Sequence, residues 1–258
     1  MGQSAWLFRS GAIAVGKSPV EIPVSKEVRM QFTRERKLGS ISTFLGANGI
    51  DPALAFVHPI GIRMAEKPLE KLAPPAAPYA SDTGELVYDK AGRTYVIRAA
   101  KAAGAVGYFR QAEAGAMDVE LVAKDHGFAT ILLTALDNLP LVQSHRMLLS
   151  TPGYTLGSGQ NLALYADTKD WWTFPPEPGS SKPAADRSAK PPILMERVES
   201  YVPLRTSAKR LTVYPLDGAG QRMAALGAKD VVRGDGTFRI HLQADGQALA
   251  PWYELVTE

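Results

Sequence analysis

Short apolar runs alternate with turn residues from residue 84 to residue 258, and this rhythm limits the folds open to the chain more than any other feature. The runs are rich in β-branched and aromatic side chains, as in GELVYD, RTYVIRAA, AVGYF, MDVELVAK and FATILLTAL, and recur roughly every ten positions. Between later runs, LDGAGQR and VRGDGTF place glycine where a tight hairpin turn needs a positive φ. Strands of this length and spacing predict a sandwich of antiparallel sheets, not alternating βαβ units.

The expected fold class is therefore mostly β, with an antiparallel β-sandwich of jelly-roll or immunoglobulin-like type over residues 81–258. Residues 1–80 are expected to form a linker and a small mixed α/β segment. We place the boundary in the proline-rich stretch 73–84, because its prolines and glycine interrupt regular structure.

Two helical patterns lie in the first part of the chain. In SKEVRMQFTRERKLG, Ser25 is a suitable N-cap and Gly39 ends the pattern. In DPALAFVHP, Asp51 precedes a proline at the first helical position, and Pro59 ends the helix. Residues 167–193 hold several prolines among mainly polar residues, so we expect a long surface loop there.

Composition argues against several kinds of partner. The formal net charge is +3 and no dense Lys/Arg run carries interleaved aromatic residues, so a nucleic-acid partner is not expected. No stretch approaches the ~18 apolar residues of a membrane span, and the first residues are too weakly hydrophobic to predict a signal peptide. The chain has no cysteine and therefore no disulfides. We expect a soluble protein without an assigned compartment.

Asp137, Ser144 and His145 are the residue types of a catalytic triad, and all three lie in the segment TILLTALDNLPLVQSHRMLLSTPGY. Adjacent residues of a strand point to opposite faces, so His145 would not reach Ser144 as its base. No G-x-S-x-G turn surrounds the serine either. We therefore interpret the segment as a hairpin in which Asp137 caps the Asp-Asn turn and Ser144 bonds the backbone.

No metal site is expected from the histidines. They are scattered, without the i, i+2 or i, i+4 spacing that brings two imidazoles together: His58, His126, His145 and His241. Structural calcium stays an open alternative, because Asp217 and Asp235 lie in glycine-containing loops. Neither loop has the alternating acidic pattern of a dedicated calcium site. We expect no other cofactor.

The strongest local signal for a ligand is aromatic. The segment LALYADTKDWWTFPPEP places Tyr165, Trp171 and Trp172 among charged residues. This composition suits stacking on the apolar faces of sugar rings, with polar groups near the hydroxyls. The competing interpretation is that these tryptophans pack against the edge of the sandwich.

Acidic residues near this loop carry a second functional hypothesis. Hydrolysis of a glycoside needs a pair of carboxyl groups, and three acids lie close to the tryptophans in sequence: Asp167, Asp170 and Glu177. Glu196 and Glu199 follow, but their odd spacing would place them on opposite faces of one regular strand. No catalytic motif fixes any of these residues, so a compact glycoside hydrolase is the alternative and not the main expectation.

Several segments resemble the β-sandwich region that follows the (β/α)8 catalytic barrel in large bacterial glycoside hydrolases. In chain order they are WLFRSGAIAVGKSPVEIPVS, SDTGELVYDKAGRTYVIRAAKAAGAVG, FATILLTALDNLPLVQSHRMLLSTPG, PILMERVESYVPL, LTVYPLDGAGQR and APWYEL. The likeness covers most of residues 6–258, and the segments occur in the same order. The chain departs from the family where YTLGSGQN and the tryptophan loop replace a short Asn-Thr-Gly segment.

The resemblance implies an accessory region that binds a polysaccharide or oligosaccharide or supports a catalytic barrel. It carries over no catalytic residue, because the barrel strands with the two catalytic carboxylates are not among the matching segments. Trp6 then corresponds to a contact with the barrel. Trp252 and Tyr253 adjoin in the last strand, so they should face opposite ways, with one of them in the core.

Overall fold

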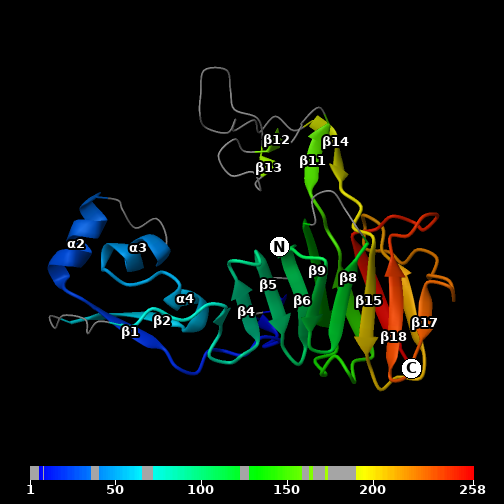
Figure 1. Ribbon diagram of the computed structural model, residues 1–258, viewed down its shortest axis with the longest axis horizontal. Coiled ribbons are helices and arrows are strands. Elements are labelled where there is room, and N and C mark those ends of the chain that lie inside the picture. The colour runs from blue at the N-terminus through cyan, green and yellow to red at the C-terminus, as the bar shows by residue number, and fades with distance from the viewer. Residues whose placement is uncertain are drawn as a thin grey trace.

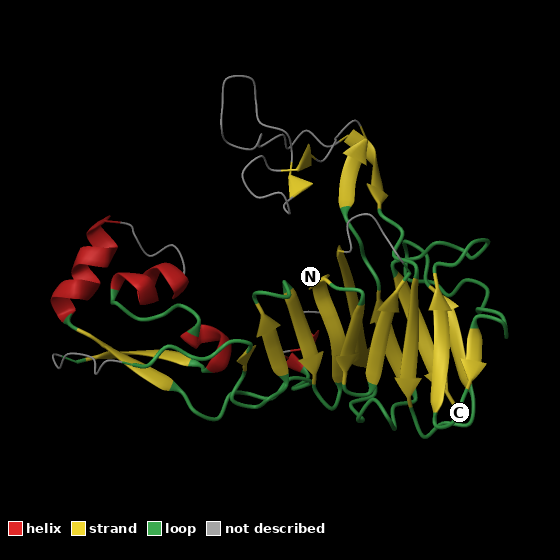
Figure 2. Cartoon of the chain, in the orientation of Figure 1, coloured by secondary structure: helices red, strands yellow, loops and turns green. Residues whose placement is uncertain are grey.

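The fold is mostly β, as expected, with two antiparallel sheets packed face to face beside a smaller N-terminal module that holds the helices (Figures 1 and 2). It is known from a computed structural model, which describes residues 6–7, 9–35, 41–65, 72–122, 128–158, 163–164, 172–173 and 190–258.

The larger sheet has eight strands, and every neighbouring pair in it is antiparallel. Its spatial order is β16 (Leu211–Pro215), β19 (Trp252–Thr257), β10 (Arg146–Ser150), β9 (Phe128–Ala135), β6 (Ala102–Tyr108), β5 (Thr94–Arg98), β4 (Leu86–Asp89) and β3 (Tyr79–Ala80). The edge strand β3 lies inside the proline-rich stretch 73–84. The last strand, β19, is inserted between β16 and β10, so the end of the chain is held within the sheet.

The smaller sheet has five strands and closes one face of the larger one. Its order is β17 (Val231–Arg233), β18 (Thr237–Leu242), β15 (Ser200–Arg205), β8 (Met117–Leu121) and β7 (Gln111–Ala114). Fully buried side chains from both sheets, among them Leu133, Met147, Leu204 and Ile240, form a single core between them. This shared core makes the two sheets a β-sandwich.

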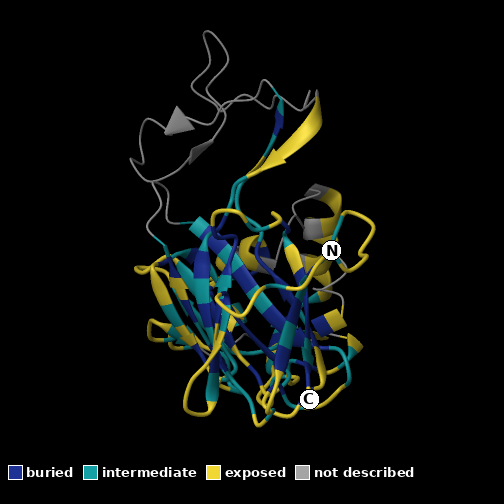
Figure 3. Ribbon diagram, turned by 90° about the vertical axis from the view of Figure 1, so that its right-hand side faces the viewer, coloured by how far each residue is buried: buried dark blue, intermediate teal, exposed yellow. Residues whose placement is uncertain are grey.

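Alternation along each strand divides the side chains between this core and the outer face of its sheet (Figure 3). On β9, Ile131 and Leu133 are fully buried in the core, whereas Leu132 packs in a separate cluster with the N-terminal segment. On β19, Tyr253 is buried and Trp252 is 43% exposed. The predicted division between Trp252 and Tyr253 is therefore confirmed.

An N-terminal segment, described at residues 6–7 and 9–14, lies on the outer face of the eight-stranded sheet. Leu7 and Ala12 are buried there against Ile97 and other residues of β5 and β6. The indole N–H of Trp6 donates to the carbonyl of Ala135 at 3.2 Å, and the N–H of Ala14 donates to a carboxylate oxygen of Glu85 at 2.6 Å. The segment is thus bound to the sheet at both ends.

The N-terminal module combines helices with a parallel pair of strands, in agreement with the expected mixed segment. Its strands are β1 (Val20–Val24) and β2 (Ile60–Met64), and its helices are α2 (Lys26–Glu35), α3 (Ile41–Ala47) and α4 (Leu54–Val57). Helices α2 and α4 occupy the two predicted helical patterns, whereas α3 was not predicted. A small core of its own, which includes Ile22, Leu45 and Leu54, holds the module together.

A two-stranded arm extends from the sandwich (Figure 1). It pairs β11 (Thr155–Ser158) with β14 (Lys190–Met195), and a further short pair joins β12 (Ala163–Leu164) to β13 (Trp172–Thr173). The interior of the expected loop, residues 174–189, lies outside the described part of the chain. The segment ILMERVESYVPL is divided between two strands, because β14 ends at Met195 and β15 begins at Ser200.

Both glycine-rich turns have the predicted form. In LDGAGQR, Gly220 has a φ of 78° and the Asp217 N–H donates to the carbonyl of Gln221. In VRGDGTF, Gly236 has a φ of 67° and the Gly234 N–H donates to the carbonyl of Thr237. These positions need glycine because other residues rarely adopt a positive φ.

Replacing Gly107 with alanine should destabilise the sandwich by about 2 kcal/mol. Gly107 lies in β6 with a φ of 130°, and a Cβ there would approach the carbonyl oxygen of Arg93 to 2.1 Å. Gly218→Ala is the matched control, because nothing lies within 4 Å of its added Cβ. Urea unfolding measures both variants. Equal free energies of unfolding for the two would contradict the close approach of β6 to the turn before β5.

Candidate functional site

The three residues of triad type build a turn. One carboxylate oxygen of Asp137 accepts the Ser144 hydroxyl at 2.8 Å, and the other accepts the backbone N–H of His145 at 2.6 Å. The Ser144 hydroxyl also lies 3.0 Å from the carbonyl oxygen of Arg146, and its side chain is fully buried. Both Ser144 and His145 precede β10 instead of lying in it. The side chains of Asp137 and Ser144 hydrogen-bond to each other and to the backbone of the turn. Their role is therefore structural, as the sequence predicted.

Three buried or half-buried carboxylates of the sandwich, those of Glu254, Asp118 and Glu199, have arginine partners. Glu254 is 5% exposed and accepts hydrogen bonds from Arg222, at 2.6 Å, and from Arg146. The bond from Arg222 and then that from Arg146 hold the pKa of Glu254 below its ordinary value, against the opposing effect of burial. On the five-stranded sheet, Arg205 binds both oxygens of Asp118, at 2.7 and 2.8 Å. These carboxylates stabilise the fold as ion pairs.

The histidines also have local roles in the described part of the chain. His241 lies 3.0 Å from Glu199 and stacks on Tyr201. His58 lies 3.8 Å from Asp82 at the junction of the N-terminal module with the sandwich. His126 lies outside the described residues. Among the residues that are described, no three His, Asp or Glu side chains gather as metal ligands.

The two loop aspartates considered as calcium ligands, Asp217 and Asp235, differ in what their carboxylates contact. One oxygen of Asp217 accepts the N–H groups of Ala219 and Gln221 at 2.9 and 2.8 Å, so this carboxylate stabilises its own turn. Asp235 is exposed in the turn between β17 and β18.

The predicted ligand-binding and catalytic residues fall mostly outside the described part of the chain. This holds for the aromatic residues Tyr165 and Trp171, and for the acids Asp167, Asp170 and Glu177. The backbone of Trp172 belongs to β13, but nothing is described of its side chain. Their roles therefore stay predictions. The neighbouring acids are placed: Glu199 pairs with His241, and a carboxylate oxygen of Glu196 lies 3.5 Å from the backbone nitrogen of Tyr154.

A different group of aromatic residues, which we call the aromatic band, crosses the outer face of the eight-stranded sheet. Its members come from α4, from β3, β4, β5, β6 and β9, and from the segment after β10: Phe56, Tyr79, Tyr88, Tyr95, Tyr108, Phe128 and Tyr154. Phe56 is 47% exposed and the other rings are half-buried. The band runs across the strands, next to the part of the sheet that residues 6–14 cover.

Strand register aligns the first half of the band. Tyr79 pairs with Tyr88, and Tyr88 pairs with Tyr95, so the three rings lie side by side on one face. Their ring centroids are 6.1 and 6.4 Å apart, and Phe56 lies 4.8 Å from Tyr88. Burial raises the pKa of Tyr95 above its ordinary value. The tyrosines therefore follow the spacing of the strands.

The second half of the band is joined through ring contacts and one hydrogen bond between two hydroxyls. Tyr108 pairs with Phe128 across β6 and β9, with ring centroids 5.5 Å apart, and Phe128 stacks on Tyr154 at 4.9 Å. The hydroxyls of Tyr108 and Tyr154 lie 2.8 Å apart. Burial, followed by this hydrogen bond, raises the pKa of Tyr154, so its hydroxyl stays protonated at neutral pH. The guanidinium of Arg93 lies 4.8 Å from the ring centre of Tyr108.

This arrangement can bind an extended ligand that has apolar faces and many hydroxyl groups. Strands in a sheet are spaced at roughly 4.8 Å, so Tyr79, Tyr88 and Tyr95 supply one ring from each of three adjacent strands. Tyr95 lies opposite Val106, so the rings of β6 and β9 form a second group. The rings supply apolar surface, and the tyrosine hydroxyls and Arg93 supply hydrogen-bond partners.

The band could not be predicted from the sequence, because its rings come from separate segments. Only the pairing of the strands in the sheet brings them together. One local signal was present: in YDKAGRTY, Tyr88 and Tyr95 are equally distant from the centre of the turn, as a cross-strand pair requires.

Comparisons with known proteins gave no match: no family model, no curated protein and no solved structure is similar to the chain. In the described ranges, no helix is both long enough and apolar enough to cross a lipid bilayer.

Replacing Asp137 with asparagine should lower the melting temperature more at pH 7 than at pH 3. Burial raises the pKa of Asp137, but hydrogen bonds from the His145 N–H and the Ser144 hydroxyl outweigh it, so the net pKa is lowered. A carboxyl group with a lowered folded-state pKa stabilises the fold above its unfolded pKa of about 4. That stabilisation is lost as the pH falls through the folded-state pKa.

Thermal unfolding of both proteins at the two pH values measures the difference. Asp235→Asn, in an exposed turn, is the control and should leave the melting temperature unchanged at both. A difference between wild type and Asp137→Asn that is as large at pH 3 as at pH 7 would contradict the role of the ionised carboxylate.

Proposed function

We propose that the chain is the accessory β-sandwich region of a glycoside hydrolase and that its aromatic band contacts a polysaccharide or oligosaccharide. The order of the segments that resemble such regions supports the enzyme class. The band supports the carbohydrate contact, and it is the observation that carries the proposal.

The physical reason is the match between the band and a glycan chain. Pyranose rings have apolar C–H faces that pack on aromatic rings, while their hydroxyls need hydrogen-bond partners. The band offers both kinds of contact on a rigid sheet, because its central residues are fixed in β4, β5 and β6. A preformed surface loses little conformational entropy when it binds.

The N-terminal segment has a role in the same proposal. Residues 6–14 are bound to the sheet through the buried side chain of Leu7 and through the hydrogen bonds of Trp6 and Ala14. A catalytic barrel joined to this segment would be held at a defined position beside the aromatic band. Its substrate would then be retained near the active site.

We do not assign hydrolysis to the described residues. The carboxylates of Glu254, Asp118 and Glu199 are engaged with Arg222, Arg205 and His241, and Asp137 forms a turn. The alternative of a compact glycoside hydrolase depends on acids near Trp171 and Trp172, which lie outside the described residues. It stays a prediction from the sequence.

Removing rings from the band should weaken glycan binding by about 2- to 10-fold per ring. The variants are Phe56→Ala and Tyr88→Val, because alanine suits the helix and valine suits the strand. Affinity electrophoresis in gels with a panel of neutral and acidic polysaccharides, such as xylan, mannan, β-glucan and polygalacturonate, measures retention. Circular dichroism checks the fold of each variant.

The control is Tyr201→Val, which removes a half-buried tyrosine from β15 in the opposite sheet. It should leave retention unchanged. The proposal fails if no polysaccharide retains the wild type, or if Tyr201→Val reduces retention as much as the band variants do. Turnover of aryl glycosides that disappears in Asp167→Asn or Glu177→Gln would favour the hydrolase instead.

A further inference from the structure

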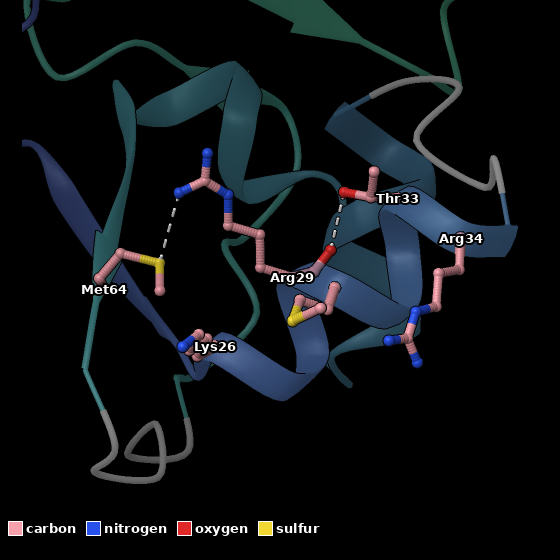
Figure 4. A pocket seen from close by; sticks show the side chains of 6 residues that line it. Lys26, Arg29, Thr33, Arg34 and Met64 are labelled. Carbon is pink, nitrogen blue, oxygen red and sulfur yellow. Dashed lines mark hydrogen bonds between the residues drawn. The ribbon is translucent and has the colours of Figure 1, made fainter.

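A pocket of about 410 Å³ lies between α2 and β2 in the N-terminal module (Figure 4). Its lining combines three cationic side chains, two methionines and one threonine: Lys26, Arg29, Arg34, Met30, Met64 and Thr33. A concave site of this size with an apolar lining and a few polar groups is typical of small-molecule binding.

Helical periodicity brings these side chains to one face of α2. Lys26, Met30 and Arg34 are each four residues apart, and Arg29 lies next to Met30 on the same face. The acidic residue of the first turn, Glu27, is not among the residues that line the pocket. The described α2 side chains that line the pocket are therefore cationic or apolar, apart from Thr33.

Arg29 extends across the pocket toward β2 (Figure 4). Its guanidinium contacts the thioether sulfur of Met64 at 3.9 Å, which is a weak acceptor for a group with five N–H donors. Within the described part of the chain, none of the ion pairs involves Lys26, Arg29 or Arg34. Among the described residues, the cationic donors of the pocket have no anionic partner, and they lie beside an apolar wall.

We propose that this pocket binds the carboxylate of a uronic acid unit, so that the glycan contacted by this chain is anionic. The inference rests on the proposed function and names the class of glycan. The guanidinium of Arg29 matches a carboxylate through two parallel hydrogen bonds. Lys26 adds a second positive charge, and the methionine side chains contact the apolar face of the sugar.

The shape of the pocket favours a sugar over an acidic peptide. A flat surface with scattered cations would attract any polyanion, but this site is concave and mainly apolar, with its cations beside the methionines. Such a site selects a ring that carries one carboxylate. Phe56, at one end of the aromatic band, belongs to the same N-terminal module as the pocket.

Arg29→Gln tests the inference, because glutamine keeps the helix propensity and length of the side chain but removes its charge. The full chain is assayed against galacturonan, alginate and hyaluronan, with methyl-esterified galacturonan as the uncharged match. At least one polyuronate should be retained by the wild type and bound roughly tenfold more weakly by Arg29→Gln. The methyl ester and neutral polysaccharides should be retained equally by both proteins.

Two controls separate the outcomes. Lys229→Gln removes a charge from an exposed residue of the sandwich and should leave polyuronate retention unchanged. Poly-L-glutamate in the gel stands in for an acidic peptide, and it should retain the protein far more weakly than the polyuronate does.

The inference is overturned if no polyuronate retains the wild type, or if a polyuronate retains Arg29→Gln as strongly as the wild type. It is also overturned if polyglutamate retains the wild type as strongly as the polyuronate does. In each case, retention of neutral polysaccharides that Tyr88→Val weakens would leave the proposed function intact. Failure to retain any glycan, neutral or anionic, would overturn both.

Discussion

The strict alternation of side chains across the eight-stranded sheet is the constraint on which the rest of the structure depends. Each strand that supplies a core residue such as Ile131 or Leu133 must also present its neighbours to the opposite face. The five-stranded sheet covers the first face. On the second face, residues 6–14 cover one part and the aromatic band occupies another. Tyr95 packs against the cluster that the N-terminal segment covers, whereas Phe56, Tyr79 and Tyr88 contact one another and are not members of that cluster.

Polar residues that resemble catalytic groups serve the same architecture. Gln243, which has a φ of 54°, accepts the N–H of Val198 and donates to Thr151 and Ala250, so one buried amide joins three segments. Asp137 and Ser144 close a turn in a comparable way. Buried polar groups are retained where they satisfy the backbone, and their residue type alone does not indicate chemistry.

Features that depend on local sequence could be predicted, and features that depend on register could not. Positive φ at Gly220 and the opposite orientations of Trp252 and Tyr253 follow from neighbouring residues. The insertion of β19 between β16 and β10, and the alignment of Tyr95 with more distant rings, depend on pairing between remote segments. Helix α3 was missed because it is only seven residues long and has neither an acidic nor a basic residue in its end turns. The predicted site around Trp171 lies beyond the described residues.

The most direct test of the aromatic band is nuclear magnetic resonance of the protein with ¹³C-labelled tyrosine rings, titrated with an oligosaccharide that it retains. Our account predicts that the resonances of Tyr88, Tyr95 and Tyr108 shift with saturation, while those of Tyr201 and Tyr214 stay in place. Shifts confined to Tyr165, beside the tryptophan loop, or to the tyrosines outside the band would contradict it.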